Sequence, residues 1–396
     1  MKTLDQIFVL TQHWLTGLAP AALQPLVSML LIIAALMAVF GTCFALTTIL
    51  ERKTLGRMQN RYGPNRVGPF GLLQPAADGI KMLTKEDIVP EAADKALHFL
   101  APLALTAPVW LAFAVLPFGR NMSAIELDAG ILFFFAIGSA SELAVFMAGW
   151  SSQNKYSLLG AMRAIAQMIS YEVPLVLASV PVLMAAGSLS LPEIVRAQSG
   201  YALGWIPRWN VLTPWGAAGF GVFLVAAAAE SNRCPFDLPE GESELIAGFL
   251  TEYSGFKYAL FFLGEYLGLF AVTGLGVTLF LGGWHAPASW LEWLPSWGWF
   301  GAKFSALIFL FIWMRATLPR LRLDQLLNFA WKFLVPLALI DLVAAAAWLK
   351  SGGWQFAWAL ETRWLLCATL LAPAYVCLGR HWRGVTPKPR RYHYAQ

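Results

Sequence analysis

The sequence predicts an all-α integral membrane protein, a bundle of about nine (eight to nine) transmembrane helices with amphipathic surface helices in its long inner loops. Of its 396 residues, 58% are hydrophobic and only 13% are charged, and the mean hydropathy is +0.60. This balance excludes a disordered chain and an ordinary soluble domain. The 18 tryptophans and 33 glycines suit helices in lipid, where indoles anchor at the interface and glycines allow close contact. We expect one multi-pass membrane domain over residues 1–396.

The helices are predicted from apolar stretches near the roughly 20 residues that a bilayer requires. Before the first stretch, polar residues interrupt the run from Leu4 to Leu18, which predicts an interfacial amphipathic helix rather than a cleavable signal. Nine candidate spans follow, at 26–50, 97–118, 130–150, 164–187, 211–229, 256–281, 299–314, 329–349 and 364–379. The seventh and ninth are the shortest, and the ninth contains Pro373, so the sequence allows eight or nine crossings.

The basic residues predict the orientation of the chain. About three quarters of the 28 lysines and arginines follow the odd-numbered spans, on the same side of the membrane as the basic tail at 380–396. Because cytoplasmic loops carry an excess of Lys and Arg, we expect the N-terminus outside and the C-terminus in the cytoplasm. Topology thus explains the basic balance, and nucleic-acid binding is not expected.

Motifs of soluble enzymes do not occur in the sequence. The four cysteines lack the short paired spacing of zinc and iron–sulfur sites, and the five histidines are scattered. The sequence has no phosphate-binding loop, no HExxH motif and no complete dinucleotide fingerprint. We therefore expect the chain to hold no metal or covalent cofactor and no complete active site of its own.

The first inner loop, at 51–96, combines rigid turns with basic residues. Gly-Pro pairs at 63–64 and 68–69 predict two turns, and Pro75 can begin an amphipathic helix along the membrane surface. Four arginines lie nearby: Arg52, Arg57, Arg61 and Arg66. Positive charge that stops membrane transfer explains part of this excess. The remainder is predicted to face a partner or a polar ligand.

The second inner loop, at 230–255, is acidic on the side of the membrane that favours positive charge. Against one arginine, Arg233, stand five carboxylates: Glu230, Asp237, Glu240, Glu242 and Glu244. A capping box at 237–240 predicts a helix that continues through Phe249. A solvated acidic face is one interpretation, but the last two carboxylates point to different faces of that helix. This favours a functional cluster, in which crowded carboxylates raise one another's pKa towards a proton-transferring range.

Acidic residues also lie inside the predicted spans, where an ionisable group costs about 2.5 to 3.5 kcal/mol and by default marks an ion or proton path. They are Glu142, Glu172, Glu265 and Asp341. No lysine or arginine is predicted at comparable depth, which favours a relay of protonatable sites over neutral acids that serve helix packing. Pro174 and Pro181 lie on one face of the fourth span, and the expected kink would suit a water path beside Glu172.

Several segments of the chain resemble one family closely. They are ERKTLGRMQNRYGPNRVGPFGLLQPAADGIKMLTKE, AIAQMISYEVP, AESNRCPFDLPEGESELIAGFLTEYSG, ALFFLGEY and RATLPRLRLDQLLNFAWKFLVPLAL. These segments are similar to the H subunit of respiratory complex I, the proton-translocating NADH:quinone oxidoreductase, whose mitochondrial counterpart is NADH dehydrogenase subunit 1. The resemblance runs from the first predicted span through the eighth.

The resemblance implies a bacterial inner-membrane subunit that forms the quinone (ubiquinone) cavity with peripheral-arm subunits and couples quinone reduction to proton translocation. Iron–sulfur clusters and FMN would belong to those partners, and antiporter-like subunits, small membrane-arm subunits and lipids would be further partners. The family's quinone-cavity and cavity-entrance residues fall on Arg52, Arg61, Asp78, Arg233, Asp237, Glu240, Glu242 and Glu244. Its acid path, or proton relay, falls on Glu142, Glu172, Glu230, Glu252 and Glu265.

Two alternatives stay open from the sequence. The first is the homologous membrane subunit of a ferredoxin-linked hydrogenase complex, which shares the inner-loop pattern. The intact carboxylates at 240, 242 and 244 favour the quinone enzyme. The second is a stand-alone ion transporter. The inner loops, which are suited to docking other proteins, and the lack of an inverted sequence repeat argue against it.

Overall fold

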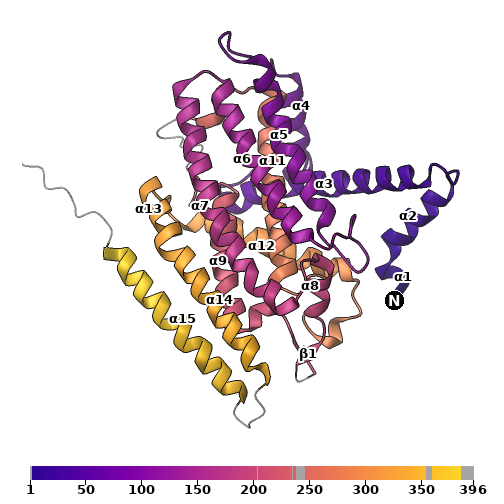
Figure 1. Cartoon of the computed structure of the whole chain (residues 1–396). Helices are drawn as coiled ribbons and strands as arrows, with labels where there is room; N and C mark the ends of the chain where they lie inside the picture. Colours follow the sequence, from indigo (N-terminus) through magenta and orange to yellow (C-terminus); the bar gives the residue numbers. More distant parts are fainter. Residues whose placement is uncertain (1, 203, 234, 238–245, 354–358, 385–396) are drawn as a thin grey trace, which may run out of the picture.

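Residues 2–202, 204–233, 235–237, 246–353 and 359–384 are described by a computed structural model of the chain. Within them the chain is mostly helical, and the strands are the short β1 (Tyr201–Ala202) and β2 (Ile206–Pro207), paired as an antiparallel hairpin. Figure 1 shows long helices side by side in a bundle, from which α3 extends as an arm. The predicted all-α membrane fold is confirmed.

In the described part of the chain, nine apolar helices correspond to the nine predicted spans. Eight are long and apolar enough to cross a membrane, and the remaining one, α9, has 17 residues. In chain order they are α3 (Gln24–Met58), α5 (Lys95–Val115), α6 (Gly130–Ser151), α7 (Lys155–Ala186), α9 (Pro214–Glu230), α11 (Gly255–Phe280), α12 (Ser296–Thr317), α13 (Leu323–Phe329) with the π-helical η5 (Ala330–Leu334) and α14 (Val335–Lys350), and α15 (Ala359–Gly384).

Shorter elements flank or connect the spans. They are α1 (Lys2–Asp5), α2 (Ile7–Gly17), η1 (Pro69–Gly71), α4 (Gln74–Thr84), α8 (Leu191–Ala197), η2 (Asn210–Leu212), η3 (Gly248–Leu250), η4 (Ser289–Leu291) and η6 (Ser351–Gly353). The helix α4 confirms the one predicted to begin at Pro75. Near the N-terminus, α2 doubles back beside α3 (Figure 1), and the Gln12 amide donates to Ser28 Oγ at 2.9 Å.

Several helices are longer than the apolar stretches predict. The first span continues to Met58, the fourth begins at Lys155, and α12 and α15 have 22 and 26 residues. An apolar stretch stops at the first charge, whereas helical hydrogen bonds continue past it because long charged side chains keep their heads in water. Consequently Glu51 belongs to α3, the first inner loop proper begins at Gln59, and the predicted tail begins inside α15.

The helix predicted from 237 through Phe249 is wrong at its C-terminal end. Residues 238–245 lie outside the described residues, but 246–250 form a turn and the 3-10 helix η3. Ile246 and Gly248 have φ values of 68° and 55°, a left-handed conformation that does not continue an α-helix. Packing accounts for the change of direction, because a Cβ on Gly160 of α7 would lie 2.7 Å from the Gly248 Cα.

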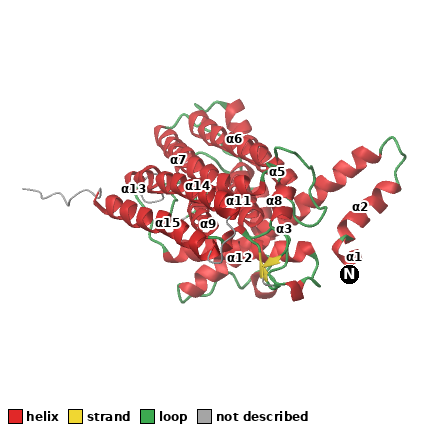
Figure 2. Ribbon diagram, turned by 60° about the horizontal axis from the view of Figure 1, so that its bottom comes forward, coloured by secondary structure: helices red, strands yellow, loops and turns green. Residues whose placement is uncertain are grey.

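The helices α7 and α11 form the centre of the bundle, and Figure 2 shows α11 among the other spans. In the most apolar stretch of α11, 72% of the residues are buried, against 50% in that of α7. Despite Pro174 and Pro181, α7 remains one continuous helix. Its Tyr171 hydroxyl donates to the Leu326 carbonyl of α13 at 3.0 Å inside the core. Among the eight helices long and apolar enough to cross a membrane, those that carry Glu172 and Glu265 are thus the best buried.

Candidate functional site

A buried group of charged residues joins α3, α11, α12 and the turn after α9. We name Glu51, Arg233, Glu265, Tyr266 and Arg315 the charge cluster. Glu51 is only 3% exposed, and it accepts hydrogen bonds from Arg233 Nη1 at 2.9 and 3.0 Å and from the Tyr266 hydroxyl at 2.6 Å. Arg315 also donates to Glu51. Two arginines and a phenol therefore compensate one carboxylate, as a charge away from water requires.

Glu51 and Arg315 were not among the predicted site residues. Both lie near helix ends beside the inner loops, where charged residues are common and indicate only topology. A signal was present, because a carboxylate inside an apolar helix needs a basic partner. However, the two arginines that pair with Glu51 lie 182 and 264 residues away along the chain. Only the fold identifies them.

A tight turn after α9 positions Arg233. Its N–H donates to the Ala228 carbonyl at 3.2 Å, and its carbonyl accepts from the Phe236 N–H at 2.7 Å. The Gln167 amide of α7 donates to the carbonyls of Ala229 and Phe236, each at 2.7 Å. Because α7 holds both sides of the turn, the guanidinium is directed into the bundle.

Arg233 also reaches Glu265, so the prediction that no basic group lies at the depth of the buried acids is wrong for Glu265. The two side chains are 3.6 Å apart from Nε to Oε1, and the guanidinium lies over the Tyr266 ring, 3.9 Å from its centroid. The prediction failed because a loop residue folds back among the spans. Burial disfavours the charged guanidinium, but the Tyr266 oxygen and the carboxylates of Glu51 and Glu265 raise the pKa of Arg233 above its ordinary value.

The first inner loop carries a second, more exposed ion pair. Arg52 Nη1 lies 2.7 Å from Asp78 Oδ2, and the Gln74 amide donates to Asp78 Oδ1 at 3.0 Å. Partial burial favours the neutral acid, but the hydrogen bonds from Arg52 and Gln74 lower the pKa of Asp78 below its ordinary value. The pair joins α4 to α3. Arg61 is exposed, and its Nε donates to Gln59 Oε1 at 2.7 Å.

Asp237 joins the second inner loop to the segment after α12. Its Oδ2 lies 2.7 Å from Arg320 Nη2, and the Leu321 N–H donates to the Pro235 carbonyl at 3.2 Å. Three further carboxylates predicted for the cavity lie outside the described residues: Glu240, Glu242 and Glu244. Their role stays a prediction.

Three of the predicted relay acids lie together. We name Glu142 of α6, Glu172 of α7 and Glu230 of α9 the acid triad, since each is close enough to the others for electrostatic interaction. Ser139 Oγ of α6 donates to Glu172 Oε1 at 2.5 Å. A Cβ on Gly138 of the same helix would lie 3.8 Å from Glu230 Oε1. Thus α6 supplies one acid of the triad and contacts the other two.

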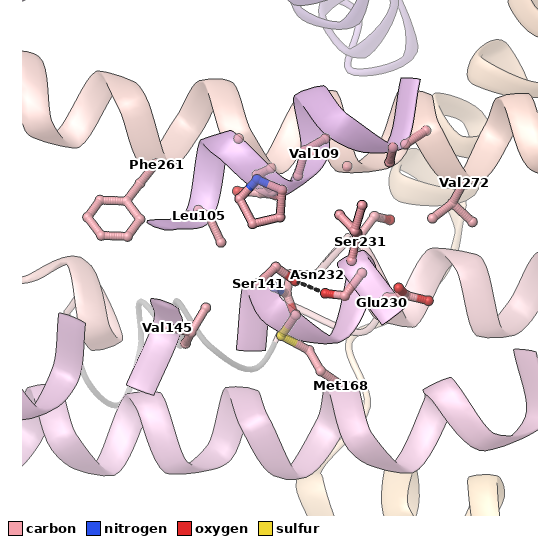
Figure 3. A pocket seen from close by; sticks show the side chains of 18 of the residues that line it. Leu105, Val109, Ser141, Val145, Met168, Glu230, Ser231, Asn232, Phe261 and Val272 are labelled. Carbon is pink, nitrogen blue, oxygen red and sulfur yellow. Dashed lines mark hydrogen bonds between the residues drawn. The ribbon is translucent and has the colours of Figure 1, made fainter. Parts of the chain in front are cut away.

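A cavity lies between the charge cluster and the acid triad. It has a volume of about 90 Å³ and is bordered by α5, α6, α7, α11 and the turn after α9 (Figure 3). Its wall includes Glu265 from the charge cluster and Glu230 from the acid triad, together with Ser141, Ser231 and Asn232. One water needs at least about 10 to 15 Å³ of such space, so the cavity has room for several waters near the two carboxylates.

Glu252 and Asp341 lie apart from this arrangement in the contacts described. Glu252 follows η3, and its Oε1 accepts from Asn154 Nδ2 at 2.6 Å. Asp341 of α14 is fully buried and lies beside Gly219 of α9. Of the five predicted relay acids, the structure therefore brings three into direct proximity, places Glu265 across the cavity, and leaves Glu252 near the start of α7.

Comparisons with known proteins agree on one family. The family model described as NADH dehydrogenase matches residues 30–346. The chain is 54% identical over 297 residues to the NADH-quinone oxidoreductase H subunit of Dehalococcoides mccartyi (strain CBDB1), an alignment covering 75% of this chain and 80% of the relative. Against the same-named protein of Polaromonas naphthalenivorans (strain CJ2), it is 44% identical over 358 residues, 88% of this chain and 98% of the relative. Against that of Geobacillus kaustophilus (strain HTA426), it is 48% identical over 314 residues, 79% and 91%.

Proposed function

Because the chain belongs to the NADH dehydrogenase family, we propose that, as the H subunit of an NADH-quinone oxidoreductase, it couples quinone reduction to proton translocation. It is a membrane subunit of that enzyme, complex I, and it acts only within the assembled enzyme. The relatives compared above all carry the name of the NADH-quinone oxidoreductase H subunit, which favours this function over a hydrogenase component or a stand-alone transporter.

The observation that carries the proposed coupling is the cavity between the charge cluster and the acid triad. Glu265 is tied to Arg233 on one side of it, and Glu230 faces it from the other. In surroundings with little water, a change of charge nearby alters strongly how readily a carboxylate ionises. A charge change at the cluster during quinone reduction would therefore load or unload a proton at Glu230, with water in the cavity as the carrier.

We propose that the quinone head group binds on the loop side of the charge cluster. The family resemblance predicts as cavity residues Arg52, Arg61, Asp78, Arg233, Asp237, Glu240, Glu242 and Glu244. The ion pairs of Asp78 with Arg52 and of Asp237 with Arg320 support this, because they tie both inner loops to the bundle. Arginine side chains offer several N–H donors, which suit the carbonyl oxygens of a quinone.

The proposed relay runs from Glu265 across the cavity to Glu230, and then to Glu172 and Glu142. The lack of an ion pair between the triad and any basic side chain of the described residues supports it, since these acids can then exist in the neutral form. We include Glu252 as a further acid of the relay; its side chain accepts a hydrogen bond from Asn154.

The inner loops are proposed to face the cytoplasm and to dock the peripheral-arm subunits, which would hold FMN and the iron–sulfur clusters. Antiporter-like subunits, small membrane-arm subunits and lipids would surround the bundle. Support for docking comes from four exposed arginines at the end of α3 and in the loop that follows it: Arg52, Arg57, Arg61 and Arg66. In the part of the chain that the structure describes, no group of His, Cys, Asp or Glu side chains is suited to hold a metal ion. Quinone enters as a substrate.

The variant Glu265→Gln in the assembled enzyme tests this function. It removes the charge that meets Arg233 while keeping the shape of the side chain, and we expect NADH oxidation by quinone to fall about tenfold or more. Oxidation of NADH by an artificial soluble acceptor should stay at the wild-type rate. Glu361→Gln, at an exposed position of α15, is the matched control. Equal loss of both activities would indicate failed assembly, and wild-type rates for both would contradict the proposal.

A further inference from the structure

Asp341 is a buried acid that the proposed relay does not use. It belongs to α14 and is fully buried, at 0% exposure. Neither carboxylate oxygen has a hydrogen-bond partner among the described residues. An isolated carboxylate away from water is so costly that it takes up a counter-ion or a proton instead of standing alone. The position of Asp341 therefore points to a bound cation or proton.

Helices α7, α11 and α14 meet at Gly219 of α9, where α14 contributes Asp341. A Cβ on Gly219 of α9 would lie 2.9 Å from Asp341 Oδ2, 3.5 Å from the Ala178 carbonyl oxygen of α7 and 3.5 Å from the Phe280 ring of α11. The carboxyl group thus fits because residue 219 has no side chain. The fully buried Cys367 of α15 is close enough to Asp341 for electrostatic interaction. Among the described residues near Asp341, it is the side chain that can also titrate.

The donor atoms at this place favour a proton over a metal ion. A hard cation such as Ca²⁺ takes roughly six to eight oxygen ligands. Besides the two oxygens of Asp341, the other oxygen found near Gly219 is the carbonyl of Ala178. A proton needs one carboxylate oxygen only, and it cancels the buried charge.

A cavity of about 900 Å³ with mostly apolar walls lies between α9, α14 and α15, and Asp341 is not itself part of its wall. Its wall includes Leu337, one helical turn before Asp341, and Ala368, the residue next to Cys367. Towards the end of α15 the cavity reaches Arg380. Asp341 therefore lies directly behind the wall of a space large enough to admit water or lipid.

We propose that Asp341 is a second proton-binding site of this membrane protein, separate from the acid triad and served by the cavity between α9, α14 and α15. The carboxylic acid gives its proton to a water that reaches it from that cavity, which leaves a carboxylate and a hydronium ion, and the reverse step reloads it. Along α7, Ala178 lies six residues beyond Glu172, about 9 Å by the helical rise, so the two sites are at different depths. The inference rests on the proposed function, because a bound proton matters in a protein that moves protons.

Infrared difference spectroscopy of the assembled enzyme during turnover tests the bound proton directly. We expect a carbonyl band of a protonated carboxylic acid that shifts in deuterated water and is lost in Asp341→Asn. If that variant fails to assemble, Asp341→Glu keeps the acid and should move the band. A spectrum unchanged by either variant, or a band that does not shift in deuterated water, would overturn the proposal.

Proton counting separates this inference from the proposed function. In sealed vesicles, Asp341→Asn should lower the number of protons moved per electron, while Glu361→Gln, an exposed control on α15, should keep the wild-type ratio. A wild-type ratio in Asp341→Asn together with a lowered ratio in Glu230→Gln would overturn the second site and leave the proposed function standing.

Discussion

At the scale of single residues, Glu51 illustrates what a buried charge requires. Arg233 and Tyr266 hydrogen-bond to its carboxylate, and Arg315 completes the compensation. Removing one member of such a network destabilises the fold, because its partner is then left as an uncompensated buried charge. The charge cluster is therefore both the core of the proposed coupling site and a point at which the protein is vulnerable.

Arg233→Met should reduce the amount of assembled enzyme in the membrane. Loss of one partner from a buried ion pair costs about 3 to 5 kcal/mol, because Glu51 and Glu265 would lose their shared counter-charge. The measurement is quantitative native electrophoresis of mildly solubilised membranes. Arg61→Met is the matched control, since Arg61 is exposed and such a contact contributes about 1 kcal/mol or less. Equal assembly of the two variants would contradict the role of the charge cluster.

Asp78 leads to a prediction about pH. Its pKa is lowered below its ordinary value by the hydrogen bonds from Arg52 and Gln74, which outweigh partial burial. A depressed pKa means that the ion pair is fully present above the unfolded-chain value near about 4 and is lost only as the pH falls through the lower folded value. Asp78→Asn should therefore reduce quinone-linked NADH oxidation by the same factor at every pH between about 5.5 and 8. A factor that varies across this window would show that Asp78 titrates there.

At the scale of helices, small residues set the distances between the central spans. Gly149 of α6 lies so close to α7 that a Cβ there would meet the Ala161 Cβ at 2.3 Å. In lipid, such close contact replaces the hydrophobic driving force that packs helices in water. The spacing matters for function because α6 and α7 carry two members of the acid triad.

Gly160→Ala should destabilise the protein, because the new methyl group would lie 2.7 Å from the Gly248 Cα and 2.9 Å from the Phe249 nitrogen. Backbone atoms cannot move aside as a flexible side chain can, and we expect a cost of about 1 to 3 kcal/mol. The measurement is the thermal stability of the purified enzyme in mild detergent. Gly79→Ala in α4, where nothing lies within 4 Å of the added Cβ, should leave stability unchanged or raise it. The reverse order of the two variants would contradict the packing argument.

The helices could be predicted from the sequence because lipid demands long apolar segments. Their ends could not, since α12 and α15 continue past charged residues such as Arg315 and Arg363 that interrupt an apolar stretch. The turn at Ile246 was also missed, because its left-handed backbone depends on the contact of Gly248 with Gly160. Local pattern thus determines that a helix exists, and tertiary contacts determine where it stops.

At the scale of the whole molecule, a site residue could be predicted from the sequence only where it is unusual in its own segment, as a charged residue is in an apolar span. Acids inside apolar spans stand out by cost alone, and Glu142, Glu172 and Glu265 were recognised in this way. Glu51 and Arg315 are not unusual in this way, because charged residues are common near helix ends, and the two are 264 residues apart in the chain. The family resemblance supplied residues that neither periodicity nor cost would select, such as Asp78.

Within the bundle, the charge cluster and the acid triad are two polar regions with a cavity between them. The charge cluster draws on α3, α11, α12 and the turn after α9, whereas the acid triad draws on α6, α7 and α9 (Figure 1). Glu265 and Glu230 border the cavity from these two regions. The central claim is that protons cross between the regions here, so that quinone chemistry on one side drives proton movement on the other.

The number of protons moved per electron in sealed vesicles containing Glu230→Gln enzyme tests this claim most directly. The substitution keeps the shape of the side chain and removes its ability to carry a proton, and Glu361→Gln serves as the exposed control. We expect assembly and oxidation of NADH by a soluble artificial acceptor to be unchanged, and the ratio of protons to electrons during quinone reduction to fall or quinone reduction itself to slow. A wild-type ratio at a wild-type rate of quinone reduction would contradict the claim that Glu230 lies on the path of the protons.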